Sequence, residues 1–367
     1  MSEWKTYKWG DLISLEYGKP IPDKNLLDGQ YPVYGTNGRI GTSNLTPLCK
    51  HPSIIVGRKG AYRGVHYSNK PFSVIDTAFF VEPKTSILDL KWAYYKLLTV
   101  NINKMDSGSA IPSTDRYEIY SLSVELPSLD EQRRIAGILG SLDDKIELNR
   151  RINANLEAQA QALFRSWFVD NDKQLGNYQT KSLTDIAQYL NGLAMQKFPP
   201  ESIQNSLPVL KIKELGQGLC DASSDRCSTS IKPEYVINDG DVIFSWSGTL
   251  LVDVWCGGKC GLNQHLFKVT SDNYPKWFIF YWTKHHLDKF IRIAKDKAVT
   301  MGHIKRCDLE SSGVKVPEKP ILEYLDKIFT PLFDSMITHR IENRKLSALR
   351  DTLLPKLMAG EINIENQ

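Results

Sequence analysis

Residues 128–168 read SLDEQRRIAGILGSLDDKIELNRRINANLEAQAQALFRSWF, and this stretch predicts one long helix. Ser128 and Glu131 have the spacing of a capping box, in which two side chains satisfy backbone N–H groups at a helix start. Apolar residues then recur along one helical face without an intervening proline: Ile135, Ile138, Leu142, Ile146, Ile152, Leu156, Leu163 and Trp167. Roughly 40 residues predict a rod of about 60 Å.

A second stretch of the same kind starts near Pro320, a favourable residue for a first helical turn. Its apolar stripe superposes on the first at an offset of 190, as Ile135 on Leu325, Leu142 on Leu332, Leu156 on Leu346 and Leu163 on Leu353. Polar residues, Asn149 and His339, interrupt both stripes at the midpoint. We expect these ten residues to pack two helices together as an antiparallel coiled coil. The alternative is that each helix lies on its own domain.

The sequence before each helix is also duplicated. Gly10–Gly18 matches Thr184–Gly192 at an offset of 174, and Ser53–Gly60 matches Asp241–Gly248 at an offset of 188. The segment that ends in Pro127 returns as the segment that ends in Pro317, at an offset of 190. Because the order of the matches is preserved, a repeat of this length indicates a duplicated domain rather than a solenoid.

The expected organisation is two globular domains, 1–127 and 176–317, and two helical segments, 128–175 and 318–367. Within each domain, short β-type runs alternate with turn residues, and short helices are expected at 92–100 and 277–293. The predicted fold class is α+β, with two duplicated domains separated by two long helices.

Composition narrows the possible functions. The chain has 367 residues, 41% of them hydrophobic, and a formal net charge of +4. It has neither an apolar run long enough to span a membrane nor the layout of a secretory signal, so a cytoplasmic location is expected. The six cysteines form no Cys-x-x-Cys pair, and Cys256, Cys260 and His265 lack the usual zinc spacing, so no metal is expected.

Motifs for catalysis are not evident. Gly257-Gly258-Lys259 is followed by Cys260 and does not continue as a phosphate-binding loop. The string Phe198-Pro199-Pro200-Glu201 has the prolines of a methyltransferase motif without its flanking groups. We therefore predict a chain without a catalytic site.

The first helix carries a more specific signal. The segment Leu126 to Ile135, with Ile138-Leu139 and Leu142-Asp143 after it, resembles the start of the first conserved helix in specificity subunits of type I restriction-modification enzymes. The run Leu163-Phe164-Arg165-Ser166-Trp167-Phe168 resembles the end of that helix, and Leu353 to Ile362 resembles the close of the second. Lys319 to Glu323 departs from the family pattern at the start of the second helix.

The resemblance implies a DNA-binding protein with two target-recognition domains, each of which reads half of a bipartite, asymmetric site. It implies two methyltransferase subunits that carry S-adenosylmethionine and a motor-nuclease restriction subunit as partners. This chain itself would bind no cofactor.

Two segments of the first domain are candidates for contact with double-stranded DNA. The glycine-rich loop 57–64 contains Arg58 or Arg63 to pair with a guanine edge, and Lys59 and Tyr62 beside them. The small-residue turn 107–114 follows Lys104 and contains Ser109 and Ser113. A hairpin with incidental surface arginines and a plain helix cap are the alternatives.

The matched positions of the second domain carry different side chains. Trp246, Ser247 and Thr249 replace the arginine loop, and Lys297, Thr300 and His303 lie in the counterpart of the small-residue turn, next to a basic run. We therefore expect the two half-sites to differ in base sequence. Two other functions remain open: a coiled-coil scaffold with duplicated protein-binding heads, and a degenerate DNA methyltransferase.

Overall fold

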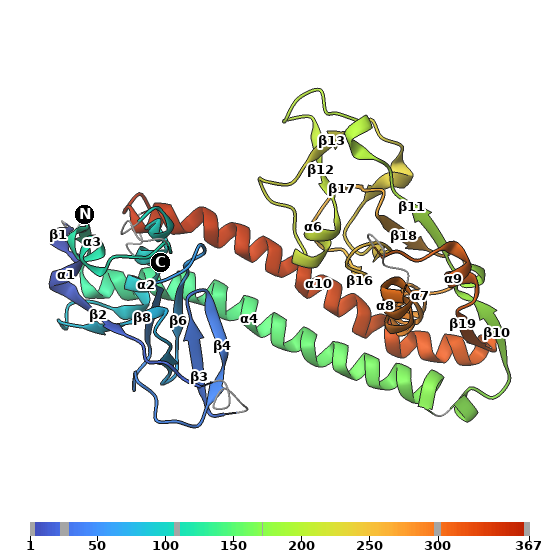
Figure 1. Cartoon of the computed structure of the whole chain (residues 1–367), viewed down its shortest axis with the longest axis horizontal. Helices are drawn as coiled ribbons and strands as arrows, with labels where there is room; N and C mark the ends of the chain where they lie inside the picture. The colour runs from blue at the N-terminus through green and yellow to red at the C-terminus, as the bar shows by residue number, and fades with distance from the viewer. Residues whose placement is uncertain (1–3, 23–28, 106–110, 171, 297–301, 363–367) are drawn as a thin grey trace. The chain divides into compact units, whose positions relative to one another are not determined.

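The computed structural model describes residues 4–22, 29–105, 111–170, 172–296 and 302–362. The chain divides into two compact units (Figure 1). The first unit comprises Met1–Asp144 and Ser347–Gln367, and the second comprises Lys145–Leu346. Each boundary between the two units lies inside a long helix. The domain ranges expected from the sequence instead end before each helix, because they treat the helices as separate segments.

The first unit is built around a four-stranded antiparallel sheet in the order β2-β8-β5-β6. Its strands are β2 (Ile13–Tyr17), β8 (Ala78–Pro83), β5 (Ser53–Gly57) and β6 (Val65–Ser68). A three-stranded sheet in the order β4-β3-β7 adjoins it, from β3 (Tyr31–Gly35), β4 (Gly38–Ser43) and β7 (Ser73–Val74). β8 is an almost wholly apolar run, as expected for a central strand with both faces covered.

Short elements close the first unit. Strand β1 (Lys5–Lys8) pairs with β9 (Ser123–Leu126), which leads directly into the long helix. The helices of this unit are α1 (Trp9–Leu12), α2 (Leu90–Leu98) and α3 (Arg116–Ser121), with a 3-10 turn at Ile102–Lys104. Asp89 and Asp115 cap α2 and α3, since their carboxylates accept backbone N–H groups of the first turns.

The second unit repeats this plan. Its four-stranded sheet has the order β11-β18-β15-β16, from β11 (Gln188–Asn191), β18 (Leu266–Thr270), β15 (Val242–Ser245) and β16 (Leu251–Val254). Strand β10 (Tyr178–Ser182) pairs with β19 (Gly313–Pro317) as β1 pairs with β9. Its helices are α5 (Leu183–Ile186), α6 (Ile212–Gln217), α7 (Lys276–His285), α8 (Leu287–Asp296) and α9 (Arg306–Glu310).

The second sheet of this unit is larger than its counterpart. Four strands lie in the order β13-β12-β17-β14: β12 (Ser206–Leu210), β13 (Arg226–Ser228), β14 (Val236–Ile237) and β17 (Cys260–Leu262). Strand β12 runs parallel to β17, as β3 runs parallel to β7. The extra residues that shift the repeat offset from 174 to 188 therefore lie in this sheet and its loops.

Strand registers confirm the duplication. Ser14 is paired with Glu82 and Gln188 with Thr270. These partners differ by the offsets of 174 and 188 that the sequence matches give. One expected helix differs: residues 277–293 form two helices, because α7 ends at His285 and α8 begins at Leu287.

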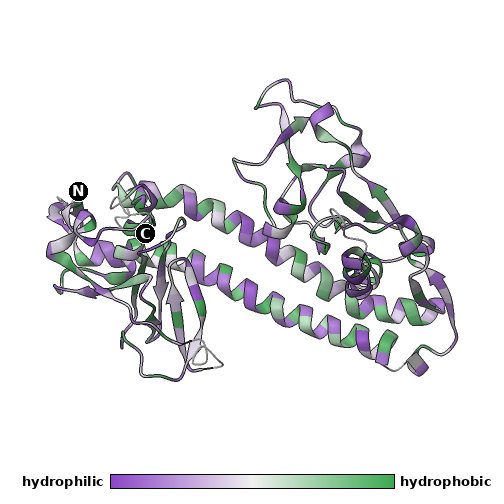
Figure 2. Ribbon diagram, in the orientation of Figure 1, coloured by the Kyte–Doolittle hydropathy of each residue, from purple (hydrophilic) through white to green (hydrophobic). Residues whose placement is uncertain are grey.

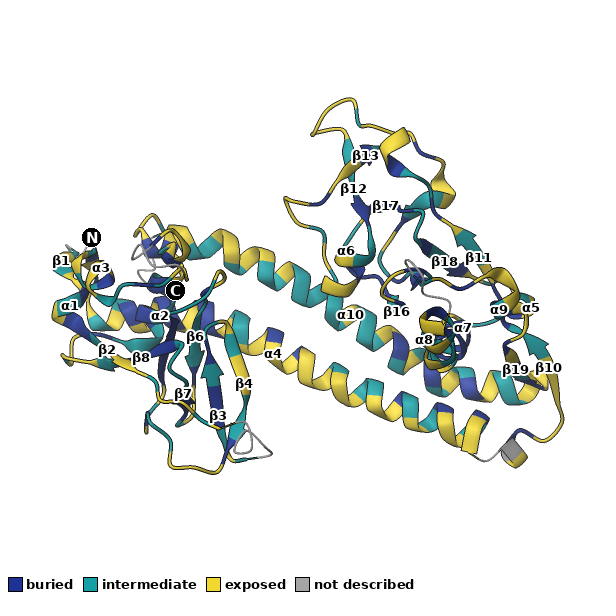
Figure 3. Cartoon of the chain, viewed as in Figure 1, coloured by how far each residue is buried: buried dark blue, intermediate teal, exposed yellow. Residues whose placement is uncertain are grey.

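Each unit has its own hydrophobic core, visible as buried strands and helices in Figure 3. Trp92 on α2 is 0% exposed and Trp277 on α7 is 1% exposed. Both tryptophans are thus core residues at matching positions. Trp277 also stacks on Phe329 with ring centroids 4.2 Å apart, which attaches the second long helix to its domain.

The two long helices are α4 (Leu129–Arg165) and α10 (Lys319–Met358). Both alternate hydrophobic and hydrophilic residues along their length (Figure 2). A π-helical turn, Ser166–Asp170, follows α4, and its Phe168 is buried in the second core. The helix predicted to reach Phe168 therefore continues to that residue with altered winding.

The helices run antiparallel where they meet inside the units. In the second unit, the Asn153 amide donates to the Met336 carbonyl at 2.9 Å, and the Asn343 amide donates to the Ile146 carbonyl at 3.2 Å. In the first unit, Arg350 donates to Asp143 at 2.8 Å. Residue numbers fall on one helix as they rise on the other, which confirms the predicted antiparallel pairing.

Each of the two midpoint polar residues forms hydrogen bonds to the opposite long helix. Asn149 is 0% exposed and its amide donates to Glu342 at 2.7 Å and to Asn343 at 2.9 Å. His339 pairs with Asn153 through Nδ1 and Oδ1, 2.9 Å apart. Asn149 and His339 thus belong to one polar layer between the helices. Within this layer Asn149 contacts Glu342 and Asn343, whereas His339 contacts Asn153.

Several predicted helix–helix residues also pack on the domains. Ile135 is buried in the first core, and Leu325 is buried in the second. Partly buried Leu163 and Leu332 lie against the second core, and Leu353 against the first. The two alternatives drawn from the sequence are therefore not exclusive, because the helices contact both each other and the domains. Among the described helices, none is both long and apolar enough to cross a membrane.

Candidate nucleic-acid interface

In the first unit, the two candidate DNA-facing segments lie side by side. The Gly60 amide donates to the Pro112 carbonyl at 2.9 Å, and the Thr114 amide donates to the Arg58 carbonyl at 2.8 Å. Lys59 and Ser113 form an antiparallel bridge between these hydrogen bonds. The loop after β5 and the turn before α3 therefore form one surface.

The second unit contains the same bridge. The Gly248 amide donates to the Gly302 carbonyl at 3.0 Å, and the Ile304 amide donates to the Trp246 carbonyl at 3.1 Å. Ser247 and His303 form the antiparallel bridge. Both hydrogen bonds match those of the first unit at offsets of 188 and 190, so the duplication extends to the backbone geometry of the candidate site.

Backbone contacts fix the loop after β5. The amides of Arg58 and Lys59 both donate to the Thr77 carbonyl, at 2.8 and 3.1 Å. The Thr36 hydroxyl donates to the carbonyls of Lys59 and Thr77. Gly60 has a φ of +122°, a conformation that disfavours side chains and explains a glycine here.

Arg58 belongs to a cluster at the end of this bridge. Its guanidinium carbon lies 4.8 Å from the centroid of the Tyr17 ring, and its Nη1 donates to the Asp76 carbonyl at 3.0 Å. The guanidinium carbon of Arg116, at the start of α3, lies 5.0 Å from the same ring. Phe79 packs against Tyr17 with centroids 5.0 Å apart. We call Tyr17, Arg58, Phe79 and Arg116 the first cluster.

The second cluster occupies the matching positions in the second unit and comprises Asn191, Trp246, Phe267 and Arg306. The Trp246 indole Nε1–H donates to Asn191 Oδ1 at 3.0 Å, and its ring stacks on Phe267 at 5.6 Å. Arg306 lines a pocket together with Asn191, Trp246 and Phe267. Its side chain is 78% exposed and lies 3.5 Å from Glu310.

Six of these residues were not predicted as site residues: Tyr17, Phe79, Arg116, Asn191, Phe267 and Arg306. The repeat offsets carried the signal, because 174 relates Tyr17 to Asn191 and 190 relates Arg116 to Arg306. An arginine is therefore present at the start of the matching helix in both copies. The loop position changes from arginine to tryptophan.

Such clusters are suited to nucleic acid. Arginine pairs with phosphates or with a guanine edge, and aromatic rings stack on bases. Arg58 and Arg116 each pack on the Tyr17 ring by cation–π contact, which limits their rotamers before a ligand binds. The second cluster offers one arginine and an indole, so it presents a different set of groups.

The other predicted residues differ in how far they are exposed. Tyr62 is 80% exposed, and Lys104 is exposed at the end of its 3-10 turn. Thr249 and His303 are exposed in the second unit, while Ser247 is 4% exposed and lies 2.9 Å from His265 Nδ1. Ser247 thus orients a neighbouring histidine and presents little surface of its own.

The structure places Arg63 elsewhere. This arginine is 3% exposed, and its Nη2 donates to the carbonyls of Ile102 and Met105 at 3.0 and 2.8 Å. Asn103 and the Arg63 backbone exchange two further hydrogen bonds. The prediction that Arg63 reads a guanine does not fit this geometry, because its guanidinium is buried and fastens the 102–105 turn.

Three predicted residues, Ser109, Lys297 and Thr300, lie outside the described residues. Of the described lysines and arginines from Tyr281 to Arg306, the exposed ones are Arg292, Lys295, Lys305 and Arg306. Lys289 donates to the Ser311 carbonyl and the Ser312 hydroxyl, so this lysine stabilises the junction before β19. The basic surface of the second unit is therefore narrower than the sequence indicated.

Comparison with known proteins identifies the family. The family model described as "Type I restriction modification DNA specificity domain" matches residues 1–158 and 176–346. The MjaIX specificity subunit of a type I restriction enzyme from Methanocaldococcus jannaschii is 26% identical over 310 residues, which cover 77% of this chain and 71% of the relative. The HindI specificity subunit from Haemophilus influenzae is 22% identical, with 99% of this chain and all of the relative covered (100%).

A solved structure shares the fold. The type I restriction-modification S subunit from M. genitalium superposes with a TM-score of 0.63 at 17% identity, and the match covers 97% of this chain and 96% of that one. Specificity subunits are non-catalytic components of their complexes, in agreement with the prediction from the sequence. The family model matches most of the chain in two copies, so the chain belongs to the type I restriction-modification DNA specificity family.

Proposed function

We propose that this chain reads a bipartite, asymmetric DNA site, with one half-site contacted by each unit. The first cluster and the loop beside it contact one half-site, and the second cluster contacts the other. Arg58 and Arg116 supply bidentate hydrogen-bond donors to one half. Trp246 and Arg306 supply an apolar surface and one guanidinium to the other.

The observation that carries the proposal is a repeated backbone bridge with different side chains. The Gly60–Pro112 and Gly248–Gly302 hydrogen bonds hold equivalent positions in the two units. At these equivalent positions, Arg58 is replaced by Trp246. A shared backbone geometry supports a shared task, and changed side chains support two different base sequences.

The chain directs other subunits to this site. Two methyltransferase subunits, which bind S-adenosylmethionine, dock on the paired helices, and a motor-nuclease restriction subunit joins them. The named relatives support this assignment, since they are specificity subunits of type I restriction enzymes. We further propose that the chain binds no cofactor itself and acts in the cytoplasm, where the DNA is.

A genome-wide map of DNA methylation tests the proposal, in cells with and without this gene and with the methyltransferase gene intact. Loss of one bipartite motif with two different halves on deletion is the expected result. An unchanged methylation pattern, with the chain expressed at normal abundance, contradicts it. S-adenosylmethionine binding by the isolated chain would indicate a degenerate methyltransferase instead.

A further inference from the structure

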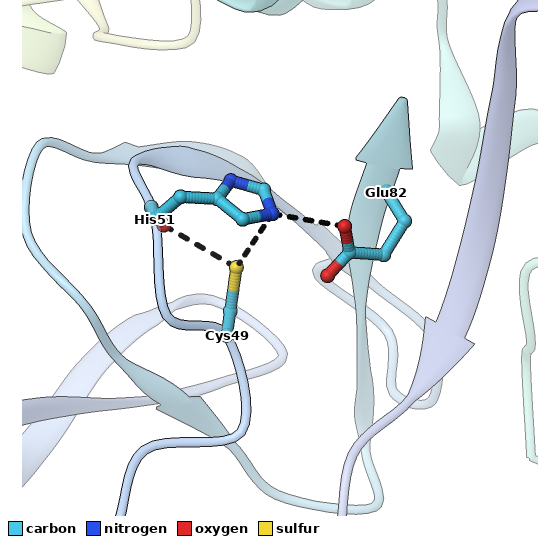
Figure 4. Close-up of side chains that lie close together, drawn as sticks. All are labelled: Cys49, His51 and Glu82. Carbon is cyan, nitrogen blue, oxygen red and sulfur yellow. Dashed lines mark hydrogen bonds and ion pairs between the residues drawn. The ribbon is translucent and has the colours of Figure 1, made fainter. Parts of the chain in front are cut away.

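Three potential metal ligands meet on the first unit, away from the first cluster. Cys49, His51 and Glu82 place one sulfur, one imidazole nitrogen and one carboxylate oxygen within 4.8 Å of one another (Figure 4). His51 Nε2 lies 3.8 Å from Cys49 Sγ and 2.9 Å from Glu82 Oε2. Sulfur, imidazole and carboxylate together match the preferences of zinc.

Each of the three residues is held by the backbone. Cys49 is 0% exposed and exchanges two backbone hydrogen bonds with Phe72, at 3.0 and 2.9 Å. Glu82 lies on β8, the strand between β2 and β5. Ser53, two residues after His51, donates its hydroxyl to the Val81 carbonyl next to Glu82. The ligand atoms are therefore set on two fixed segments.

The histidine is oriented as metal-binding histidines are. His51 Nδ1 lies 3.0 Å from the Pro52 carbonyl, which can only accept a hydrogen bond. Nδ1 therefore carries the proton, and Nε2 points toward Cys49 and Glu82. A backbone carbonyl at the far nitrogen is the usual arrangement that fixes the tautomer of a histidine ligand.

We propose that Cys49, His51 and Glu82 bind one zinc-class divalent ion, with water completing the coordination. The ion would join the segment before β5 to the central strand β8. This inference is independent of the proposed DNA-reading function. It also differs from the metal site weighed in the sequence, which involved Cys256, Cys260 and His265.

Two of the three separations between the ligand atoms fit with small adjustments. Tetrahedral zinc with bonds of about 2.3 Å to sulfur and about 2.1 Å to nitrogen separates these ligand atoms by about 3.6 Å. The observed separation of Cys49 Sγ and His51 Nε2 is 3.8 Å. Glu82 must withdraw by about half an ångström from His51 to become a co-ligand, because a nitrogen–oxygen edge is about 3.4 Å. Its side chain is 39% exposed and His51 is 40% exposed, so the ligands can adjust and the ion has a route from solvent.

A catalytic role for the same three residues is disfavoured. The Cys49 side chain is 0% exposed, so its thiol presents no surface to a substrate. Without an ion, His51 and Glu82 form an ion pair, and the Cys49 thiol donates to the His51 carbonyl at 3.3 Å. A metal ion would bring all three ligand atoms to one centre.

Titration of the full chain tests the proposal. The purified chain, stripped with a chelator and kept reduced, is titrated with Zn²⁺ against a chromogenic chelator and, separately, with Co²⁺ alone. The expected result is one Zn²⁺ per chain and a cobalt–thiolate charge-transfer band. Cys49→Ser removes the band, and His51→Gln and Glu82→Gln weaken Zn²⁺ binding by at least tenfold.

Controls separate this site from the other thiols. Cys307→Ser, at an exposed cysteine, and Cys220→Ser, at a half-buried one, leave the affinity and the band unchanged. Since Cys49 is wholly buried, the partly exposed His51 and Glu82 variants keep the test valid if Cys49→Ser fails to fold. No Zn²⁺ binding by the folded chain overturns the proposal, as does binding that survives these variants and is lost with Cys220.

Discussion

Arg340 on α10 and Asp253 on β16 form a two-pronged ion pair. Nη1 lies 2.8 Å from Oδ1 and Nη2 lies 2.7 Å from Oδ2, with side chains 32% and 29% exposed. Arg344 makes the same kind of pair with Asp239 one helical turn later. These two pairs fasten the long helix to β16 and to the turn between β14 and β15 with fixed geometry.

Arg340→Ala should therefore destabilise the second unit, because it leaves the Asp253 carboxylate half-buried without its partner. The expected loss is about 1–2 kcal/mol, toward the low end for a charged pair since both groups keep some solvent contact. Urea unfolding of the chain measures it. Arg150→Ala, at an exposed arginine of α4 with only a loose ion pair, is the control and should change little.

An Arg340→Ala, Asp253→Ala double-mutant cycle checks the cause. Removal of both partners should lower the free energy of unfolding by less than the sum of the two single changes, because no unpaired charge then remains. Additive losses would mean that the two residues stabilise the unit separately.

Arg116→Ala and Arg306→Ala should each weaken DNA binding by about tenfold. Both arginines begin the matching helices α3 and α9 beside the bridge of their unit. If each neutralises one phosphate, each variant also lowers the slope of log affinity against log salt by about 1. Binding to a site-containing duplex at several salt concentrations measures both quantities, with Arg133→Ala on α4 as the exposed control. An unchanged salt slope with weaker binding would instead assign the arginine to base contact.

Trp246→Ala should relax the base preference of one half-site and leave the other half unchanged. Its indole is held by Asn191 and Phe267, so its removal empties the centre of the second cluster. Methylation mapping in cells that carry the variant shows which half of the motif degenerates. Arg58→Ala should affect the opposite half, which makes each variant the control of the other. Loss of both halves in either variant would contradict the assignment of one half-site to each unit.

The sequence was informative where the structure repeats itself. The offsets of 174, 188 and 190 predicted which strands and turns correspond, and the paired registers follow them. Apolar periodicity likewise predicted the two long helices to within a few residues of α4 and α10. Periodicity and duplication are properties of the chain itself, so they can be read without coordinates.

The candidate site was harder to predict, because its side chains come from distant segments. Arg58 and Arg63 look alike in a glycine-rich basic loop, yet only Arg63 finds two carbonyls, those of Ile102 and Met105, to bury against. Tyr17 and Arg116 are ordinary residues in the sequence and meet only when β2 and α3 are in place. Such partners depend on tertiary packing, which no local pattern encodes.

Acid should weaken the second unit through His286. Burial lowers the pKa of His286 from 6.5 to about 4, although its hydrogen bond to the Gly313 carbonyl opposes the shift. The unfolded chain takes up this proton near pH 6.5 and the folded chain only near pH 4, so stability is lost as the pH falls through that interval. The loss is on the order of 2 kcal/mol between about pH 7 and about pH 4.5.

His286→Gln should reduce this loss, because glutamine retains a donor for Gly313 and does not titrate. Urea unfolding at both pH values, compared with wild type, measures the difference. His303→Gln is the matched control at an exposed histidine. An equal pH dependence in wild type and His286→Gln would assign the acid sensitivity to other groups.

Insertions in the paired helices should change the spacing of the half-sites without changing their sequences. Four helical residues add about 6 Å, close to two base pairs of about 3.4 Å each. The insertions are placed between Asp144 and Lys145 on α4 and between Leu346 and Ser347 on α10, which are the boundaries of the two units. The Asn149 layer and the Arg350–Asp143 pair then remain within their own units. Methylation mapping should then show the same two half-sites with a longer spacer.

Four inserted residues also rotate the helix by more than a full turn. An insertion of seven residues, which nearly restores the helical phase, is therefore the companion variant. Altered half-site bases with an unchanged spacer would mean that the helices do not set the distance, and that the units are positioned by the partner subunits instead.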